Sequence, residues 1–315
     1  MDAIRAEGLE KRFGPVRALD GLTLTVEEGT IYGFLGPNGA GKTTTIRLLT
    51  GLARPTGGRA WVAGLEVGRD RRELARRIGY LPEEPAFYPW MTPEEYLDHV
   101  GRIFGLSADE RLSRTRELLR RVGLDEVRRR RIGGFSRGMR QRLGLAQALV
   151  NRPQVLFLDE PLSALDPAGR KEVLDLIESL RGGCTVFMST HILADVERVC
   201  DTVGIIARGR MIAQASQEEL AQRYAVPAFE LECERGQEET LAAWAAALPL
   251  SIPWVAHATL DGSTVRVIVR DVAAAKRELL ALAVRSGLVL NRYEMVRPSL
   301  EDIFLRLVGT EEATA

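Results

Sequence analysis

The chain has 315 residues, 45% of them hydrophobic, which is enough to bury a large core in two domains. Lys+Arg and Asp+Glu both number 43, so the zero net charge does not indicate purely electrostatic binding to nucleic acid or an anionic membrane. Three scattered cysteines, not at metal-ligand spacing, are expected to be core residues in a reducing compartment. No apolar run approaches the ~20 residues of a membrane span, so we expect a cytoplasmic protein.

Residues 1–84 alternate short β-like runs with glycine-rich turns. One strong helix interrupts them, predicted from Lys42 to about Thr50 with Gly51 as its C-terminal cap. Helical periodicity follows from residue 92 to about residue 150. The stretches PQVLFLDE, CTVFMST and TVGIIAR then predict buried strands separated by two helices. A continuous apolar strand that ends in acidic residues and is followed by a helix is typical of a mostly parallel α/β sheet.

After Ile212 the predicted order is β, α, β, β, α, β, which matches the split-βαβ, ferredoxin-like motif of small α+β domains. A terminal helix, SLEDIFLRLV, follows it. We therefore predict a first domain over residues 1–215, with a helical subdomain at about 85–150, and an accessory domain over residues 225–315.

Residues 36–43 fit the pattern G-x-x-x-x-G-K-[ST] between a predicted strand and a predicted helix. Such a loop turns backbone N–H groups toward a phosphate chain, and the helix N-terminus adds positive charge. Lys42 is expected to bridge the β- and γ-phosphates of ATP, and the Thr43 hydroxyl to ligate Mg²⁺. A plain glycine-rich turn is the alternative, but the flanking strand and helix favour a nucleotide site. The predicted nucleotide-binding residues here are Gly36, Pro37, Asn38, Gly39, Ala40, Gly41, Lys42, Thr43 and Thr44.

Two acidic residues end the strand VLFLDE. Asp159 is predicted to hold Mg²⁺ through water, and Glu160 to polarise an attacking water as general base. His191 follows the strand CTVFMST, where a neutral imidazole can hydrogen-bond a γ-phosphate or that water. Each feature alone is more often an ordinary strand end or a structural histidine. Their combination with the phosphate loop favours catalysis.

The stretch GFSRGMRQRLGLAQALVNRPQVLFLDEPLSALDP, residues 134–167, resembles the ATP-binding subunits of ABC transporters, and the resemblance covers about two-thirds of the chain. It implies an ABC-type P-loop NTPase fold in which two chains sandwich two ATP molecules. FSRGM lies at the family's signature loop, and SALD resembles the loop that reaches across the dimer. Carried over by motif, Ser136 and Gly138 contact a phosphate of the partner subunit's ATP, and Asp166 reaches across the dimer. His191 matches the switch histidine. Phe13 matches the aromatic residue that stacks on adenine, with Val16 packing beside it.

Two departures from the family pattern stand out. The family signature LSGGQ is replaced at Phe135, Arg137 and Met139, although the two small residues that the contact requires are kept. In LPEEP, Glu83 stands where the family usually has Gln, the residue that links Mg²⁺ to the membrane partner. A carboxylate can also coordinate Mg²⁺, so Glu83 remains a predicted metal ligand, and its effect on coupling stays open.

The resemblance implies a separate transmembrane permease and a second ATP-binding subunit, identical or different, with the chain peripheral on the inner face of the cell membrane. FYPWMTPEEYLDHV resembles the start of the subdomain on which the permease docks. We expect two of its aromatics, among Phe87, Tyr88 and Trp90, to be core, and an exposed remainder to line a docking groove. The C-terminal residues SLEDIFLRLVG resemble the ends of bacterial multidrug and antibiotic-resistance exporter ATPases. This indicates export of a drug, a lipid or another small molecule.

Other functions fit less well. An ABC ATPase acting on DNA or ribosomes would carry a coiled-coil insertion or two tandem nucleotide domains, and this chain has neither. A GTPase would show an N-K-x-D motif, and a P-loop kinase would leave FSRGM, SALD and STH unexplained. The run Arg128–Arg131 reads as a solvated loop, or as a contact for lipid head groups or an acidic partner; no nucleic acid is expected because aromatics are not interleaved with it. The accessory domain is expected to support dimerisation or regulation.

Overall fold

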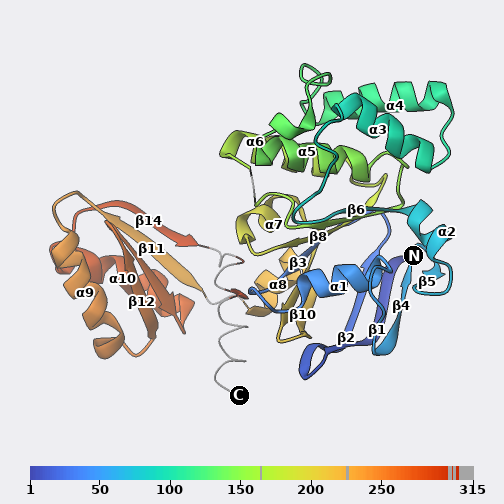
Figure 1. Cartoon of the computed structure of the whole chain (residues 1–315). Helices are drawn as coiled ribbons and strands as arrows, with labels where there is room; N and C mark the ends of the chain where they lie inside the picture. The colour runs from blue at the N-terminus through green and yellow to red at the C-terminus, as the bar shows by residue number, and fades with distance from the viewer. Residues whose placement is uncertain (164, 225–226, 297–299, 301–302, 305–315) are drawn as a thin grey trace. The chain divides into compact units, whose positions relative to one another are not determined.

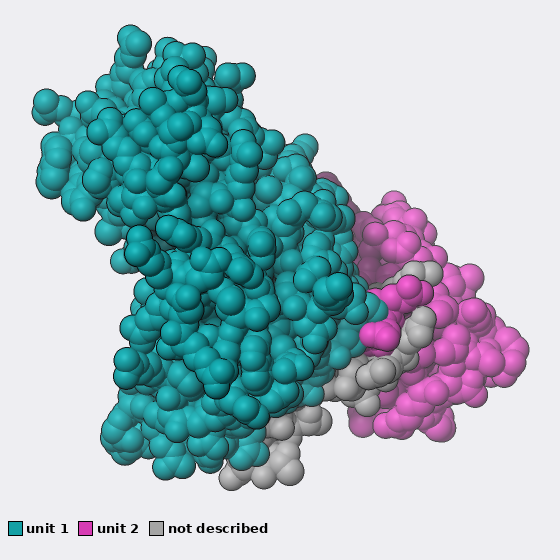
Figure 2. Space-filling view, turned by 90° about the vertical axis from the view of Figure 1, so that its right-hand side faces the viewer, with its two compact units in different colours: residues 1–217 teal, residues 218–315 magenta. Residues whose placement is uncertain are grey.

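In the computed structural model, the chain folds into two compact units, Met1–Gln217 and Glu218–Ala315 (Figures 1 and 2). The structure describes residues 1–163, 165–224, 227–296, 300, 303 and 304. The predicted terminal helix SLEDIFLRLV therefore lies largely outside the described residues. No helix within the described ranges is both long enough and apolar enough to cross a membrane.

A six-stranded sheet forms the centre of the first unit. Its strands, in spatial order, are β10 (Arg210–Ser216), β9 (Thr202–Ala207), β3 (Ile31–Leu35), β8 (Thr185–Thr190), β7 (Val155–Asp159) and β6 (Ile78–Leu81). All neighbouring strands are parallel except the edge pair of β10 and β9. Every residue of β3 and β7 is buried, as expected for parallel strands covered on both faces. The predicted mostly parallel α/β sheet is confirmed.

An antiparallel sheet packs over one face of this centre. Its strands, in spatial order, are β2 (Val16–Glu27), β1 (Asp2–Phe13), β4 (Gly57–Val62) and β5 (Leu65–Glu66). Helix α1 (Lys42–Leu49) lies between the two sheets, and one buried cluster contains side chains of both sheets and of this helix (Figure 1). Gly51 follows the helix with φ +74°, the left-handed conformation predicted for its C-terminal cap.

The structure contains a second helix before residue 84, α2 (Arg71–Arg77), which the sequence analysis did not predict. Leu74 is its one fully buried side chain, so the helix has no apolar period to reveal it. The signal that was present is its N-cap, where the Asp70 side chain accepts a hydrogen bond from the Glu73 amide at 3.0 Å.

The helical subdomain forms where periodicity predicted it. Its helices are α3 (Pro93–Ile103), α4 (Ala108–Arg121), the 3₁₀ turn η1 (Ile132–Gly134) and α5 (Arg137–Ala148). Capping boxes start both α3 and α4, because Thr92 and Ser107 each exchange hydrogen bonds with a glutamate three residues later. The Tyr96 hydroxyl donates to Gln147 Oε1 at 2.6 Å, which ties α3 to α5.

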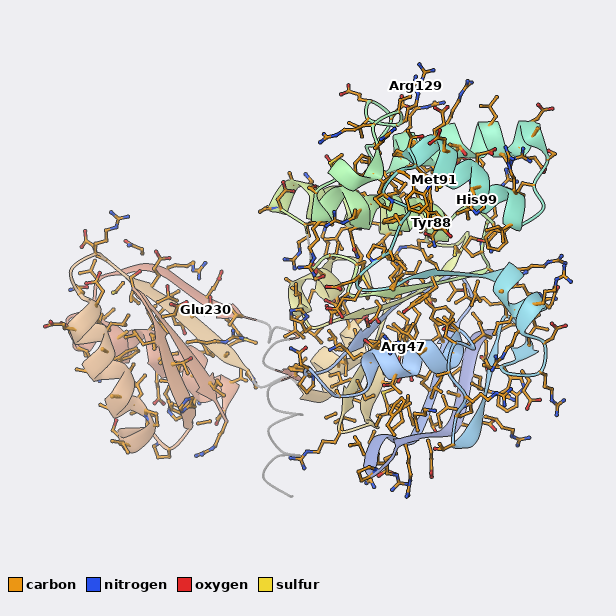
Figure 3. All side chains as sticks on the ribbon, in the orientation of Figure 1. Arg47, Tyr88, Met91, His99, Arg129 and Glu230 are labelled. Atoms are coloured by element: carbon orange, nitrogen blue, oxygen red, sulfur yellow. The ribbon has the colours of Figure 1, made fainter. Side chains whose placement is uncertain are left out.

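The aromatic segment before α3 is more exposed than predicted. Phe87 is half-buried against Tyr96, with ring centroids 5.1 Å apart. Tyr88 and Trp90, however, are 46% and 65% exposed, and the Tyr88 ring lies 6.4 Å from His99 on α3 (Figure 3). The expectation of two core aromatics is therefore wrong. The chain turns here, where the Met91 amide donates to the Tyr88 carbonyl, so the short apolar run does not continue into the core.

Two helices connect the remaining central strands as predicted, α6 (Pro167–Glu178) between β7 and β8, and α7 (Leu193–Val199) between β8 and β9. Helix α8 (Gln217–Tyr224) follows β10. Each βα unit thus returns the chain to the same edge of the parallel sheet, so the carboxyl ends of β3, β7 and β8 are neighbours.

The second unit is an antiparallel sheet with two helices on one face. Its strands, in spatial order, are β12 (Val255–Asp261), β13 (Thr264–Val269), β11 (Ala228–Cys233) and β14 (Leu290–Val296), and its helices are α9 (Glu238–Ser251) and α10 (Val272–Arg285). Phe229, Leu231 and Val267 on the sheet pack with Leu241 and Leu279 on the helices. The βαββαβ order and the antiparallel pairings confirm the ferredoxin-like motif.

Candidate nucleotide-binding site

The phosphate loop connects the end of β3 to the start of α1. A Cβ on Gly36 would lie 2.4 Å from the Ile206 carbonyl oxygen, so the loop's first position has no room for a side chain. Gly41, just before the helix, has φ +110°, where an L-residue would be strained. These constraints explain the glycine spacing and leave the first turn of α1 directed at the loop.

The turn between β9 and β10 braces this loop from the side. Gly209, at φ +78°, donates its amide to the Ala40 carbonyl at 2.9 Å, and its own carbonyl accepts from the Asp20 amide at 2.9 Å. A Cβ on Gly209 would lie 2.7 Å from the Ala18 carbonyl oxygen. The loop is thus held by a main-chain hydrogen bond from the β9–β10 turn, and β2 holds that turn in place in the same way.

Lys42 is 7% exposed, and its ammonium faces the loop and the cavity. Its Nζ donates to the Gly36 carbonyl at 2.7 Å and to the Pro37 carbonyl at 3.3 Å, and lies 3.6 Å from Glu160 Oε1. A positive charge is therefore fixed beside the N–H groups of the loop, as a phosphate site requires.

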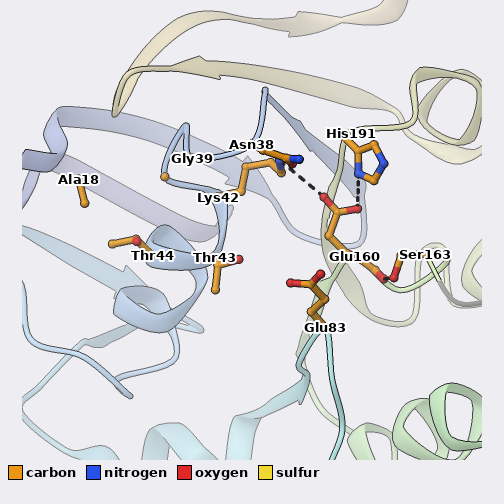
Figure 4. A pocket seen from close by; sticks show the side chains of 11 residues that line it. Ala18, Asn38, Gly39, Lys42, Thr43, Thr44, Glu83, Glu160, Ser163 and His191 are labelled. Atoms are coloured by element: carbon orange, nitrogen blue, oxygen red, sulfur yellow. Dashed lines mark hydrogen bonds and ion pairs between the residues drawn. The ribbon is translucent and has the colours of Figure 1, made fainter. Parts of the chain in front are cut away.

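The two acidic residues at the end of β7 occupy different environments. Asp159 is 1% exposed, and its Oδ1 accepts from Thr43 Oγ1 at 3.2 Å and from Ser189 Oγ at 2.6 Å. Glu160 is 8% exposed and its Oε2 lies 2.9 Å from His191 Nδ1, an arrangement in which an Nδ1–H donates to the carboxylate (Figure 4). The predicted histidine and general base are thus direct partners.

These groups surround one cavity of about 400 Å³ (Figure 4). The residues that line it are Ala18, Asn38, Gly39, Gly41, Lys42, Thr43, Thr44, Glu83, Glu160, Ser163 and His191. The structure therefore brings together predicted residues from four separate segments of sequence. Sequence reasoning did not predict Ala18, Ser163 or the buried Ser189 as site residues. Ala18 belongs to no motif, whereas Ser163 begins SALD and Ser189 begins STH; a further signal for Ser189 was a polar residue in an apolar strand.

Other predicted residues do not line this cavity. Phe13 and Val16 flank the β1–β2 turn and are 54% and 62% exposed. Ser136 caps α5, accepting from the Met139 amide at 3.2 Å, and Asp166 caps α6, accepting from the Gly169 amide at 2.8 Å. The adenine contact of Phe13 and Val16 therefore remains a prediction. The same holds for the contacts of Ser136, Gly138 and Asp166 with a second chain. Ala164, within SALD, lies outside the described residues.

The two departures from the family pattern lie next to each other. Arg137 Nη2 is 4.0 Å from Glu84 Oε1, and both side chains line a second cavity of about 360 Å³ with Glu83, Arg140 and others. Glu83 borders both this cavity and the one described above. The acidic residues Glu83 and Glu84 thus lie beside Arg137 and Arg140, which belong to α5, the helix that begins in the signature motif.

Comparison with known proteins tests the resemblance. A family model described as "ABC transporter" matches residues 19–163, and one described as "ATP-binding protein DrrA1-3-like, C-terminal domain" matches residues 216–308. The daunorubicin resistance ATP-binding protein DrrA2 of Streptomyces coeruleorubidus is 39% identical over 316 residues, covering 98% of this chain and 95% of that protein. The chain belongs to the ABC transporter ATP-binding proteins. The family expected from the sequence is confirmed.

Two further comparisons support this ABC assignment. The uncharacterized ABC transporter ATP-binding protein YxlF of Bacillus subtilis is 41% identical over 303 residues, 96% of this chain and 98% of that protein. A solved structure of an ATP-binding subunit of an ABC transporter has a TM-score of 0.66 at 30% identity, over 70% of this chain and 93% of its own. This ABC protein is therefore an ATPase, the ATP-binding subunit of a transporter with the P-loop NTPase fold and an accessory C-terminal domain.

Proposed function

We propose that the cavity binds ATP with Mg²⁺ and that Glu160 activates the attacking water. The observation that carries this proposal is the Glu160 carboxylate, held between Lys42 and His191 in a cavity that begins at the phosphate loop. A carboxylate oriented by two basic groups can accept a proton from a water directed at the γ-phosphate. His191, whose ring is 51% exposed, both orients this carboxylate and remains accessible to the nucleotide.

The residues present suit Mg²⁺. Thr43 and Asp159 already place a hydroxyl and a carboxylate oxygen 3.2 Å apart, and Glu83 borders the same cavity. Mg²⁺ is commonly held by one or two protein oxygens together with phosphates and water, and these side chains can supply such oxygens. When bound, the ion neutralises charge on the phosphates.

We infer that the chain works with a second ATP-binding subunit and a separate permease, on the inner face of the cell membrane. Ser136 and Asp166 are exposed, as residues that contact a partner's nucleotide must be. An apolar groove of about 250 Å³, bordered by Leu52, Tyr80 and Phe104, is the surface proposed for the permease. The exposed aromatics Tyr88 and Trp90, which the sequence led us to expect in such a groove, are not among the residues that line it. The similarity to DrrA2 supports export of a drug, a lipid or another small molecule.

Glu160→Gln tests this function. The amide keeps the shape but loses the base, so hydrolysis should fall at least ~100-fold while ATP still binds. We would crosslink the variant with ATP in its native cells and identify what co-purifies. Glu172→Gln is the matched control, because it makes the same chemical change at a residue of α6 whose side chain is 64% exposed. Co-purification of a polytopic membrane protein that depends on ATP supports the transporter proposal. Co-purification of ribosomes or DNA without a membrane partner contradicts it.

A further inference from the structure

Ser189 is a polar residue buried in the centre of the first unit. It lies one residue before the end of β8 and is 0% exposed. The parallel register of β7 and β8 places it opposite Asp159. A hydroxyl at such a place is destabilising unless its hydrogen bonds are satisfied, so its partners indicate its role.

The nearest partners are the two acidic residues of the site, and the Leu158 carbonyl lies farther away, 3.5 Å from Ser189 Oγ. Ser189 Oγ donates to Asp159 Oδ1 at 2.6 Å and accepts from the Glu160 amide at 3.2 Å. The Ser189 carbonyl accepts from the same amide at 3.1 Å. One residue therefore receives the Glu160 amide twice and also fixes the neighbouring carboxylate. Because the short bond to Asp159 uses the hydroxyl proton, the oxygen lone pairs are left for the amide.

The Glu160 backbone needs such support. Its φ of +49° lies in the left-handed region, which costs a non-glycine residue roughly 1–2 kcal/mol. This conformation ends the strand abruptly, and the Glu160 side chain lines the nucleotide cavity beside Lys42 and His191. Strained residues persist only where their surroundings hold them, and here the bonds to the Glu160 amide come from Ser189.

We propose that Ser189 is a positioning residue of the nucleotide site. Its hydroxyl holds the Asp159 carboxylate toward Thr43 and the Glu160 backbone in its left-handed conformation, so that metal binding and base orientation depend on one buried hydroxyl. The inference rests on the proposed roles of Asp159 and Glu160. It predicts that loss of the hydroxyl impairs Mg²⁺-dependent nucleotide binding and hydrolysis together, and leaves Mg²⁺-independent binding unchanged.

The test compares Ser189→Ala with Thr185→Ala in the full chain. Thr185 is on the same strand, is 2% exposed, and its Oγ1 accepts from the Gly29 amide at 2.9 Å at the far end of β8. Both variants lose one buried hydroxyl. Affinity for a fluorescent ATP analogue is measured with Mg²⁺ and with EDTA, and hydrolysis in a single turnover. For Ser189→Ala we expect hydrolysis on the order of 10- to 100-fold slower and a roughly tenfold smaller Mg²⁺ enhancement of affinity, since a bond to a charged group is lost.

Equal behaviour of Ser189→Ala and Thr185→Ala in both measurements overturns the inference. If Ser189→Ala does not fold, Ser189→Cys keeps the packing while weakening both hydrogen bonds, and the same losses are expected of it. Glu160→Gln separates the two levels of the argument. Rapid hydrolysis by Glu160→Gln contradicts the proposed function itself, whereas an inactive Glu160→Gln beside a fully active Ser189→Ala contradicts only the role of Ser189.

Discussion

Asp98 joins helices α3 and α4, and we expect Asp98→Ala to loosen this pair selectively. Its Oδ1 accepts from Arg111 Nε at 2.7 Å, and its Oδ2 accepts from Arg102 Nε at 2.8 Å. Arg111 is 17% exposed and also donates to the Leu106 carbonyl, whereas Arg102 is 66% exposed. The hydrogen bond from Arg111 to the charged Asp98 carboxylate contributes about 1.5–3 kcal/mol to stability, toward the lower end because Asp98 is itself 32% exposed. The exposed i,i+4 pair with Arg102 adds about 0.5 kcal/mol. The local cost should therefore be about 2 kcal/mol.

Native-state hydrogen exchange of the α3 and α4 amides measures this cost directly. A loss of about 2 kcal/mol corresponds to roughly 30-fold faster exchange of amides that open with this helix pair. Arg102→Ala, which removes only the exposed partner, should accelerate the same amides about twofold. Equal acceleration by the two variants, or less than threefold acceleration by Asp98→Ala, would refute the assignment of the stabilisation to Arg111.

The same pair predicts a pH dependence. The hydrogen bond from Arg111, more than any other contact, lowers the pKa of Asp98 below its ordinary 3.8. Because the folded-state pKa is the lower one, the stabilisation is complete above pH 3.8 and is lost as the pH falls through the lowered value. The difference in melting temperature between wild type and Asp98→Ala should thus be full at pH 7 and shrink below about pH 4.

Two more predictions concern single side chains. Phe13→Ala should leave the melting temperature unchanged, because the ring is 54% exposed. The same variant should bind ATP about tenfold more weakly in calorimetry, since stacking on a base contributes about 1–3 kcal/mol. Unchanged affinity would contradict the predicted contact of Phe13 with adenine. Burial raises the pKa of the Cys184 thiol to about 12, so iodoacetamide at pH 8 should label it only after unfolding, as followed by mass spectrometry. Rapid labelling of the native protein would contradict the burial of this thiol just before β8.

The chemistry that is continuous in sequence was predictable. The phosphate loop occupies eight consecutive residues, so its spacing alone predicts it. Asp159 and Glu160 adjoin each other at a strand end, and they were predicted as site residues because they occur together with that loop. The mostly parallel sheet followed from unbroken apolar strands between helices. The ferredoxin-like unit followed from its order of helices and strands.

The parts that depend on register or exposure were not predictable in this way. Ser189 reaches Asp159 only because β7 and β8 pair in one particular register across 30 residues of chain. Helix α2 buries too few apolar side chains to show a helical period. Tyr88 and Trp90 lie in an exposed turn, although aromatic residues in sequence suggest burial. Neighbour relations of this kind belong to the folded chain and not to any short window of sequence.

The turn at Gly209 makes the phosphate loop and the edge strand β10 parts of one hydrogen-bonded framework. The Gly209 amide is bonded to Ala40 in the loop, and β10 begins at the next residue and runs directly into α8, where the second unit starts. The strand that leads to the accessory domain therefore begins one hydrogen bond away from the phosphate loop. The path from the phosphate loop to the accessory domain thus runs through one hydrogen bond, between Ala40 and Gly209, and then through the unbroken main chain of β10 and α8.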